Sequence, residues 1–156
     1  MRNKTCALIL ENLRSVENTA SIFRTAEGLK VSKIVLIGTT PAPLDRFGRI
    51  RSDFAKISLG SEDMVPWEYK KDIYETLEEL KDQDFQIISL ELTHESKDLR
   101  DFKSKDKFAL VVGNEVDGVS KEALKASDAM VEIPMQGKKE SLNVSVSTGI
   151  ALFMLI

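Results

Sequence analysis

Residues 131 to 146 carry the polar side chains best suited to hold a small polar ligand. They read Val-Glu-Ile-Pro-Met-Gln-Gly-Lys-Lys-Glu-Ser-Leu-Asn-Val-Ser-Val. We expect a strand that ends near Ile133, a turn rich in Pro and Gly, and a helix whose first turn carries Ser141 and Asn143. The first N–H groups of a helix have no partner within the helix, so they can face a ligand. The segment therefore predicts a site for a polar ligand.

A second polar segment, 113–118, reads Gly-Asn-Glu-Val-Asp-Gly. Its two glycines allow a sharp turn or a close approach of the backbone to a ligand. Glu115 between them could orient a polar ligand or accept hydrogen bonds from neighbouring backbone amides, and the sequence leaves both open. The segment is not a phosphate loop, because it lacks the Gly-Lys-Ser/Thr of the Walker pattern and the three glycines of the dinucleotide pattern.

The third segment, 11–18, leads into a predicted helix that bears Arg24. Arg24 lies about 200° around that helix from the apolar Ile22, so it faces away from the buried side. Arg24 is then free to act at a surface or interface, or it is a solvated arginine paired with Glu17 or Glu27.

The elements that must position these segments read as an α/β sheet with helices on both sides. Four short runs are continuously apolar and rich in β-branched residues, as parallel strands covered on both faces are: 6–10, 34–37, 85–90 and 108–112. Helical spacing between them aligns Ile22, Ala26 and Leu29, and then Ile73, Leu77 and Leu80. Two shorter strands are expected at 130–133 and 64–69. Pro66 places the second of these at an edge of the sheet, because proline lacks the N–H that an inner strand needs. Ligands bind beyond the carboxyl ends of such strands, where all three polar segments begin.

Length and composition favour one domain, because 156 residues with 42% hydrophobic residues suffice for one core. The sequence shows no signal peptide and no apolar stretch of the roughly 18 residues that span a bilayer, so we expect a cytoplasmic protein without a membrane partner. The one cysteine, Cys6, is interpreted as a core residue. It excludes an intrachain disulfide and a cysteine-based metal site, and no metal is expected.

The net charge of −3 argues against broad, non-specific affinity for nucleic acid. Any RNA contact must then use a local basic patch. The candidate is the group Arg46, Arg49, Arg51 and Lys56, in a stretch where the only acids are Asp45 and Asp53. Solvated surface is the alternative interpretation of these four charges.

Three motifs, in order along almost the whole chain, resemble those of the SpoU (TrmH) branch of the SPOUT RNA methyltransferases. The first, Asn followed six residues later by Arg and then Thr or Asn, is matched by Asn18, Arg24 and Thr25. The second, Gly-x-Glu-x-x-Gly after an apolar strand, is matched by Gly113, Glu115 and Gly118. The third, Ile-Pro-Met and then Gly and Ser-Leu-Asn-Val, is matched by Ile133, Pro134, Met135, Gly137, Ser141, Leu142, Asn143 and Val144.

The resemblance implies an α/β domain whose C-terminal part forms a deep trefoil knot, an exception to the rule against threaded chains. It implies S-adenosylmethionine as the cofactor, enclosed by backbone groups around Leu90, Gly113, Ile133, Ser141 and Leu142. It also implies a homodimer in which each active site uses both chains. The first and last helices would form that interface, to which the apolar run 150–156 is suited.

The reaction implied by the resemblance is transfer of a methyl group to a ribose 2′-hydroxyl of tRNA or rRNA. The resemblance assigns catalysis to Arg24, helped by Ser141 and Asn143. A guanidinium normally stays protonated, so we expect Arg24 to hold a phosphate and stabilise the developing alkoxide rather than act as a base. Asn18 and Glu115 would position Arg24 and the loop.

Two other classes of function remain as alternatives. A non-catalytic RNA-binding domain could keep the cofactor pocket, although Arg24, Ser141 and Asn143 argue against it. A Rossmann-type nucleotide enzyme would need a glycine fingerprint after the first strand, where residues 11–18 have none. We interpret residues 1–156 as one methyltransferase domain without a separate N-terminal RNA-binding domain. The last residues are expected to stop in mid-helix, as they would in a truncated sequence.

Overall fold

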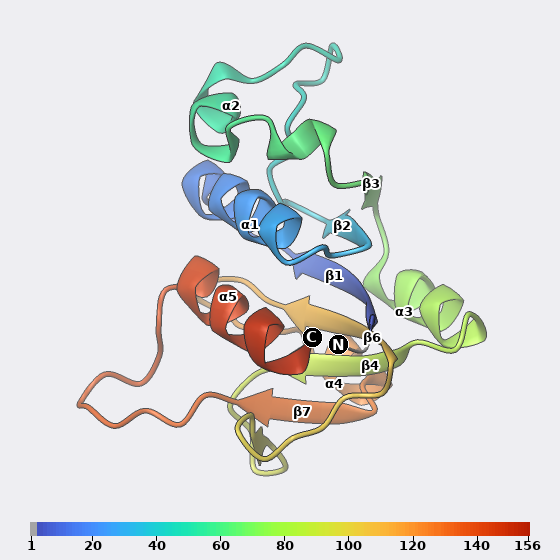
Figure 1. Cartoon of the computed structure of the whole chain (residues 1–156), viewed down its shortest axis with the longest axis vertical. Helices are drawn as coiled ribbons and strands as arrows, with labels where there is room; N and C mark the ends of the chain where they lie inside the picture. Colours follow the sequence, from blue (N-terminus) through green and yellow to red (C-terminus); the bar gives the residue numbers. More distant parts are fainter. Residues whose placement is uncertain (1–2) are drawn as a thin grey trace.

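Seven parallel strands form the centre of the molecule, with helices on both faces of the sheet (Figure 1). The structure, a computed structural model, describes residues 3–156. The strands are β1 (Thr5–Glu11), β2 (Lys33–Ile37), β3 (Trp67–Lys70), β4 (Gln86–Leu90), β5 (Lys97–Asp98), β6 (Lys107–Val112) and β7 (Ala129–Glu132). Their order across the sheet is β3-β2-β1-β6-β4-β7-β5, and each pair of neighbours is parallel. The predicted α/β class is confirmed.

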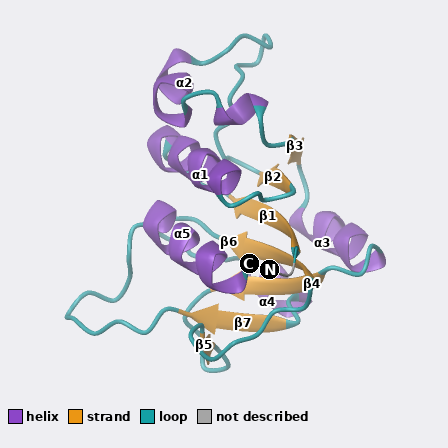
Figure 2. Ribbon diagram, in the orientation of Figure 1, coloured by secondary structure: helices purple, strands orange, loops and turns teal. Residues whose placement is uncertain are grey.

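The helices divide between the two faces of the sheet (Figure 2). They are α1 (Val16–Gly28), α2 (Ser52–Ser58), α3 (Ile73–Asp82), α4 (Lys121–Ala126) and α5 (Val144–Leu155), with a short 3₁₀ turn, η1 (Ser61–Asp63). The buried side chains of α1, α2 and α5 pack in one apolar cluster, and those of α3 and α4 pack in the other. The sheet is therefore covered on both sides.

Strand β1 shows why its apolar run is continuous rather than alternating. Successive side chains of a strand point to opposite faces of the sheet. Cys6, Leu8 and Leu10 belong to the cluster with α1 and α5, whereas Ala7 and Ile9 belong to the cluster with α3. All five are at most 1% exposed, which confirms that both faces are buried.

All six predicted strands are present, with one boundary corrected. The strand expected at 64–69 begins only at Trp67, because Val65 donates its N–H to Ser61 in a turn that closes η1. That strand, β3, lies at the predicted sheet edge. The two predicted sets of aligned apolar residues are confirmed as well. Those from 22–29 and from 73–80 are buried or packed against the core. The two-residue strand β5 and the helix α2 were not predicted.

The segment after β4 crosses from one edge of β7 to the other. Strand β7 pairs with β4 on one side and with β5 on the other. The chain from residue 91 to 106 therefore leaves β4, crosses to the far edge of β7 and returns to the start of β6. Within it, Glu91 and Leu99 donate their N–H groups to the carbonyls of Val131 and Glu132. The chain that follows β7 leads into α5, which packs against α1.

Candidate functional site

A chain of side-chain hydrogen bonds joins the three polar segments. The amide of Asn18, in the first turn of α1, donates to Glu115 at 3.3 Å. The amide of Asn143 donates to the side-chain oxygen of Asn18 at 3.1 Å. Because these residues come from three different strand ends, the fold brings the three motifs together as the sequence predicts.

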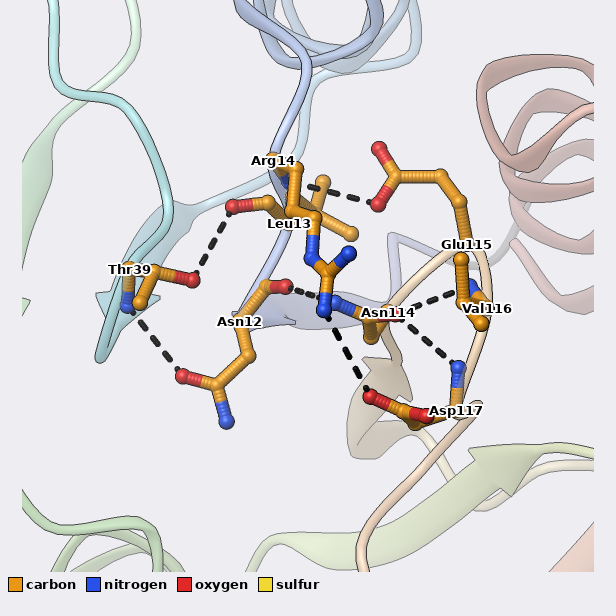
Figure 3. Close-up of polar contacts among 8 residues, drawn as sticks. All are labelled: Asn12, Leu13, Arg14, Thr39, Asn114, Glu115, Val116 and Asp117. Carbon is orange, nitrogen blue, oxygen red and sulfur yellow. Dashed lines mark hydrogen bonds and ion pairs between the residues drawn. The ribbon is translucent and has the colours of Figure 1, made fainter.

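Glu115 also binds the backbone just ahead of α1. Its carboxylate accepts the N–H groups of Arg14 at 3.2 Å and Ser15 at 3.4 Å, and the Arg14 contact is drawn in Figure 3. Partial burial alone would raise the pKa of Glu115. The hydrogen bonds donated by its own N–H, by Asn18, and by Arg14 and Ser15 outweigh that effect and hold the pKa below its ordinary value. Of the two interpretations that the sequence left open, the structure shows the hydrogen bonds to backbone amides.

Asn114 shapes the loop that carries Glu115 (Figure 3). Its side-chain oxygen accepts the N–H groups of Val116 at 2.8 Å and Asp117 at 2.9 Å, and this fixes a tight turn. Its amide donates to the carbonyl of Asn12 at 2.7 Å. The loop after β6 is thus fastened to the loop after β1, and Glu115 is held in place.

The two glycines of this loop are required by close packing. A Cβ on Gly113 would lie 2.3 Å from the backbone of Gly118 and Val119. Gly118 has a φ of +71°, and a Cβ there would lie 2.1 Å from the Glu91 carboxylate. The glycine spacing therefore closes a compact loop, which explains it without a ligand.

Two carboxylates that were not predicted from the sequence hold the end of this loop. Glu91 accepts the N–H groups of Val119 at 2.8 Å and Leu92 at 3.0 Å. Glu11, only 2% exposed, accepts the N–H of Ser120 at 3.0 Å. Their positions in the sequence could have indicated a role at the site. Glu11 ends one apolar strand and Glu91 directly follows another, at the edge of the sheet where ligands bind.

A cleft of about 1300 Å³ opens at the carboxyl ends of β4, β6 and β7. Its lining includes all five residues predicted to hold a cofactor: Leu90, Gly113, Ile133, Ser141 and Leu142. Asn18, Glu115 and Asn143 line it too. The lining mixes apolar and polar side chains in similar measure, so the cleft can offer both kinds of contact to a ligand.

The start of α5 differs by a few residues from the prediction. Asn143 is the N-cap, and its side-chain oxygen accepts the N–H of Ser145 at 2.9 Å. Ser141 and Leu142 lie before the helix in an exposed segment, so the prediction that Ser141 lies in the first turn of the helix is wrong. Within residues 3–156 the Ser141 hydroxyl forms no hydrogen bond, and it is available at the cleft.

Arg24 stands apart from the cleft of its own chain. It is exposed on α1 and is not among the cleft-lining residues. In the part of the chain that the structure describes, Arg24 forms no ion pair, so the alternative that pairs it with Glu17 or Glu27 is wrong. Neither Asn18 nor Glu115 hydrogen-bonds to it.

The predicted basic patch is partly neutralised. Arg49 pairs with Asp45 at 3.0 Å, and Arg51 pairs with Asp53 at 2.9 Å. Arg46 and Lys56 form no ion pair among the described residues. The positive charge available to a ligand is therefore concentrated at Arg46 and Lys56.

The remaining candidate groups take no part in the cleft. Cys6 is 1% exposed in the core, as predicted, and its burial raises the pKa of the thiol to about 12. Residues 3–156 contain no group of three or more His, Cys, Asp or Glu side chains placed to hold a metal ion. The same residues include no helix that is both long and apolar enough to cross a membrane.

Comparison with known proteins points to one family. Residues 5–153 match the model of the SpoU rRNA Methylase family. The chain is 34% identical over 145 residues to the 23S rRNA (guanosine-2′-O-)-methyltransferase RlmB of Neisseria meningitidis, covering 93% of this chain and 55% of that protein. It is 32% identical over 152 residues to the tRNA (guanosine(18)-2′-O)-methyltransferase of Aquifex aeolicus, covering 97% of this chain and 69% of that protein.

The fold matches solved structures of the same group. The crystal structure of an AdoMet-bound rRNA methyltransferase from Sinorhizobium meliloti superposes with a TM-score of 0.85 at 26% identity, over 98% of this chain and 56% of that one. The chain thus spans little more than half of the length of the Neisseria and Sinorhizobium proteins. The family match extends over nearly all of residues 3–156 and includes the three motifs at the cleft, so the chain belongs to the SpoU rRNA methylase family.

Proposed function

We propose that this chain transfers a methyl group from S-adenosylmethionine to a ribose 2′-hydroxyl of tRNA or rRNA. The observation that carries the proposal is the hydrogen-bonded set Asn18, Glu115 and Asn143 at the rim of the cleft. The names of the Neisseria and Aquifex relatives, both guanosine 2′-O-methyltransferases, support the reaction and the two classes of RNA.

The residues that line the cleft fit the chemistry of S-adenosylmethionine. Leu90, Ile133 and Leu142 offer apolar surface to an adenine ring, and the neighbouring loop backbone offers polar groups to a ribose and an amino acid. The Sinorhizobium relative is an AdoMet-bound structure. The cofactor would supply an electrophilic methyl group attached to a sulfonium.

The chain's own residues must align the hydroxyl and stabilise its charge. During transfer of that methyl group to the 2′-oxygen, the hydroxyl proton would leave to a phosphate or to water. The positive charge of the Arg24 guanidinium holds the adjacent phosphate and stabilises the developing negative oxygen. Ser141 and Asn143 orient the ribose, while Asn18 and Glu115 fix the loops around them.

A homodimer would supply Arg24 to the cleft. Arg24 lies outside the cleft of its own chain, on α1, which packs against α5. The exposed side of α5 is apolar, with Phe153 74% and Val146 51% exposed. A second copy of the chain placed over α5 would bury these side chains and bring its own Arg24 toward the cleft.

The proposed fold includes a deep trefoil knot near the cofactor. The path of residues 91–106 supports it, because this segment crosses from one edge of β7 to the other, beside the strand whose chain continues to α5. In this proposal residues 1–156 form the methyltransferase domain and act in the cytoplasm. Arg46, Arg49, Arg51 and Lys56 would contact the RNA.

Incubation with methyl-labelled S-adenosylmethionine and total RNA tests the proposal. We expect label in RNA with the wild-type chain, and a loss of about 10²- to 10³-fold in rate with Arg24→Ala. Lys81→Ala removes a half-buried cation, paired with Glu78 on α3, from the opposite face of the sheet; it is the control and should keep full activity. Cofactor binding measured by calorimetry without RNA separates the alternatives: binding without any transfer would favour a non-catalytic RNA-binding domain.

A further inference from the structure

The loop of residues 43–51 holds an aromatic side chain out in solvent. An antiparallel bridge between Leu44 and Ile50 closes the loop, and Phe47 lies between them. Phe47 is 66% exposed, although a phenylalanine gains free energy from burial. Two thirds of its surface is therefore open to a partner.

Hydrogen bonds fix the conformation of the loop around Asp45. Its carboxylate accepts the N–H groups of Phe47 at 2.8 Å and Arg49 at 3.0 Å. Gly48 donates its N–H to the Asp45 carbonyl at 3.0 Å and has a φ of +77°. These bonds hold the backbone of the loop, so little further backbone entropy is lost when a partner binds.

Two guanidinium groups lie against the Phe47 ring. Cζ of Arg46 lies 4.8 Å from the ring centroid, and Cζ of Arg49 lies 4.9 Å from it. A ring beside two planar cations offers the surface on which single-stranded nucleic acid is bound, because bases stack on aromatic faces and on guanidinium planes while phosphates meet the positive charge.

The segment that leads from β2 into this loop is fastened to the rim of the cleft. It follows the carboxyl end of β2, and the cleft lies at the carboxyl ends of β4, β6 and β7. Thr39 donates its N–H to the Asn12 side chain at 3.1 Å, and Asn12 accepts from the cleft residue Asn114 at 2.7 Å (Figure 3). One RNA strand could contact both places.

We propose that a single-stranded nucleotide of the RNA substrate stacks its base on Phe47, with the guanidinium planes of Arg46 and Arg49 beside that base. Arg46, which forms no ion pair among the described residues, would contact the neighbouring phosphates. This inference rests on the proposed function and names a contact outside the reacting centre. It predicts that the RNA must carry an unpaired base some distance from the methylated ribose.

Binding of RNA to Phe47 variants tests the inference. Phe47→Ala should weaken RNA binding by roughly 5- to 150-fold and raise KM with little change in kcat, because one stacked base is lost. Phe47→Trp should retain or improve binding, whereas Phe47→Leu, apolar but without a π-face, should behave like Phe47→Ala. Tyr74→Ala, an exposed aromatic on α3, is the matched control and should bind RNA normally. Equal binding by Phe47→Leu and wild type would overturn the stacking.

A fluorescence measurement separates this inference from the proposed function. When Phe47→Trp is combined with Trp67→Phe, the protein has one tryptophan, at position 47. Stacking of a base on it should quench its fluorescence. RNA that binds and is methylated without quenching overturns the inference and leaves the proposed function intact. Cofactor binding with no methyl transfer by any variant overturns the proposed function instead. A change in oligomeric state on Phe47→Ala, measured by sedimentation, would identify the ring as a protein contact and also overturn the inference.

Discussion

The side-chain amide of Asn143 donates a hydrogen bond of 3.1 Å to the side-chain oxygen of Asn18, 125 positions earlier in the chain. Asn18 in turn donates to Glu115. Because Asn143 is also the N-cap of α5, one side chain both starts that helix and joins it to the first turn of α1. Helix placement and the alignment of the site are therefore coupled.

Asn143→Asp separates these two roles. The carboxylate can still accept the N–H of Ser145 as an N-cap, so we expect the free energy of unfolding to change by less than about 1 kcal/mol. The donor to Asn18 is lost, and kcat/KM for methyl transfer should fall by roughly tenfold or more. Asn143→Ala loses both roles and should also lose about 1 kcal/mol of stability in urea unfolding. Full activity of Asn143→Asp would contradict the coupling.

Glu115 should contribute to stability in a defined range of pH. Its pKa in the folded chain lies below the ordinary value of 4.5, because four hydrogen-bond donors outweigh partial burial. Its contribution is therefore complete at neutral pH and is lost as the pH falls below about 4.5 and through the folded pKa. Urea unfolding of wild type and Glu115→Gln from pH 7 to pH 3 measures this.

The difference in unfolding free energy between those two proteins is the quantity to follow. Asp45, Asp53 and Asp98 also have lowered pKa values, but they titrate in both proteins and cancel in the difference. We expect a constant difference at neutral pH that shrinks in acid. A difference independent of pH would show that Glu115 is not held as a carboxylate.

Gly118→Ala should destabilise the loop that carries Glu115. The new Cβ would lie 2.1 Å from the Glu91 carboxylate, at a φ of +71° that L-residues rarely adopt. We expect a loss of about 1–3 kcal/mol in the free energy of unfolding. Gly28→Ala, where no atom lies within 4 Å of the new Cβ, is the control and should be neutral or slightly stabilising. Equal stabilities of the two variants would rule out the packing argument.

Phe153 provides a test of the proposed dimer. Its side chain is 74% exposed on α5, the helix that packs against α1. Phe153→Asp should place a charge in the interface and shift the sedimentation coefficient from dimer to monomer at micromolar concentration. Tyr74→Asp, on α3, introduces the same charge elsewhere and should leave the dimer unchanged. A wild-type chain that sediments as a monomer would remove the basis for supplying Arg24 in trans.

Much of the sheet can be predicted from the sequence because its strands are buried on both faces. The continuous apolar runs around Leu8 and Leu110 are consequences of that burial. Strand β5 escapes prediction, because Lys97 and Asp98 are polar and are in a strand only through pairing with β7. Strand order and the path of residues 91–106 depend on tertiary contacts that no local pattern records.

Site residues that belong to a sequence motif can be predicted, whereas residues whose role depends on tertiary contacts cannot. Asn18, Glu115 and Asn143 follow from motifs, and the structure joins them. Glu91 and Glu11 do not, because their function is to accept single backbone N–H groups from a loop distant in sequence. Phe47 lies in a polar, basic stretch, where only its exposure and its two cation–π contacts distinguish it.

The measurement that tests the central claim most directly is identification of the methylated nucleoside. RNA is incubated with the chain and S-adenosylmethionine, digested to nucleosides and analysed by mass spectrometry, with Arg24→Ala in parallel. The account predicts a 2′-O-methylribose at a defined position in tRNA or rRNA, which resists alkaline cleavage and is greatly reduced with Arg24→Ala. A methyl group on a base, or equal ribose methylation by both proteins, would contradict it.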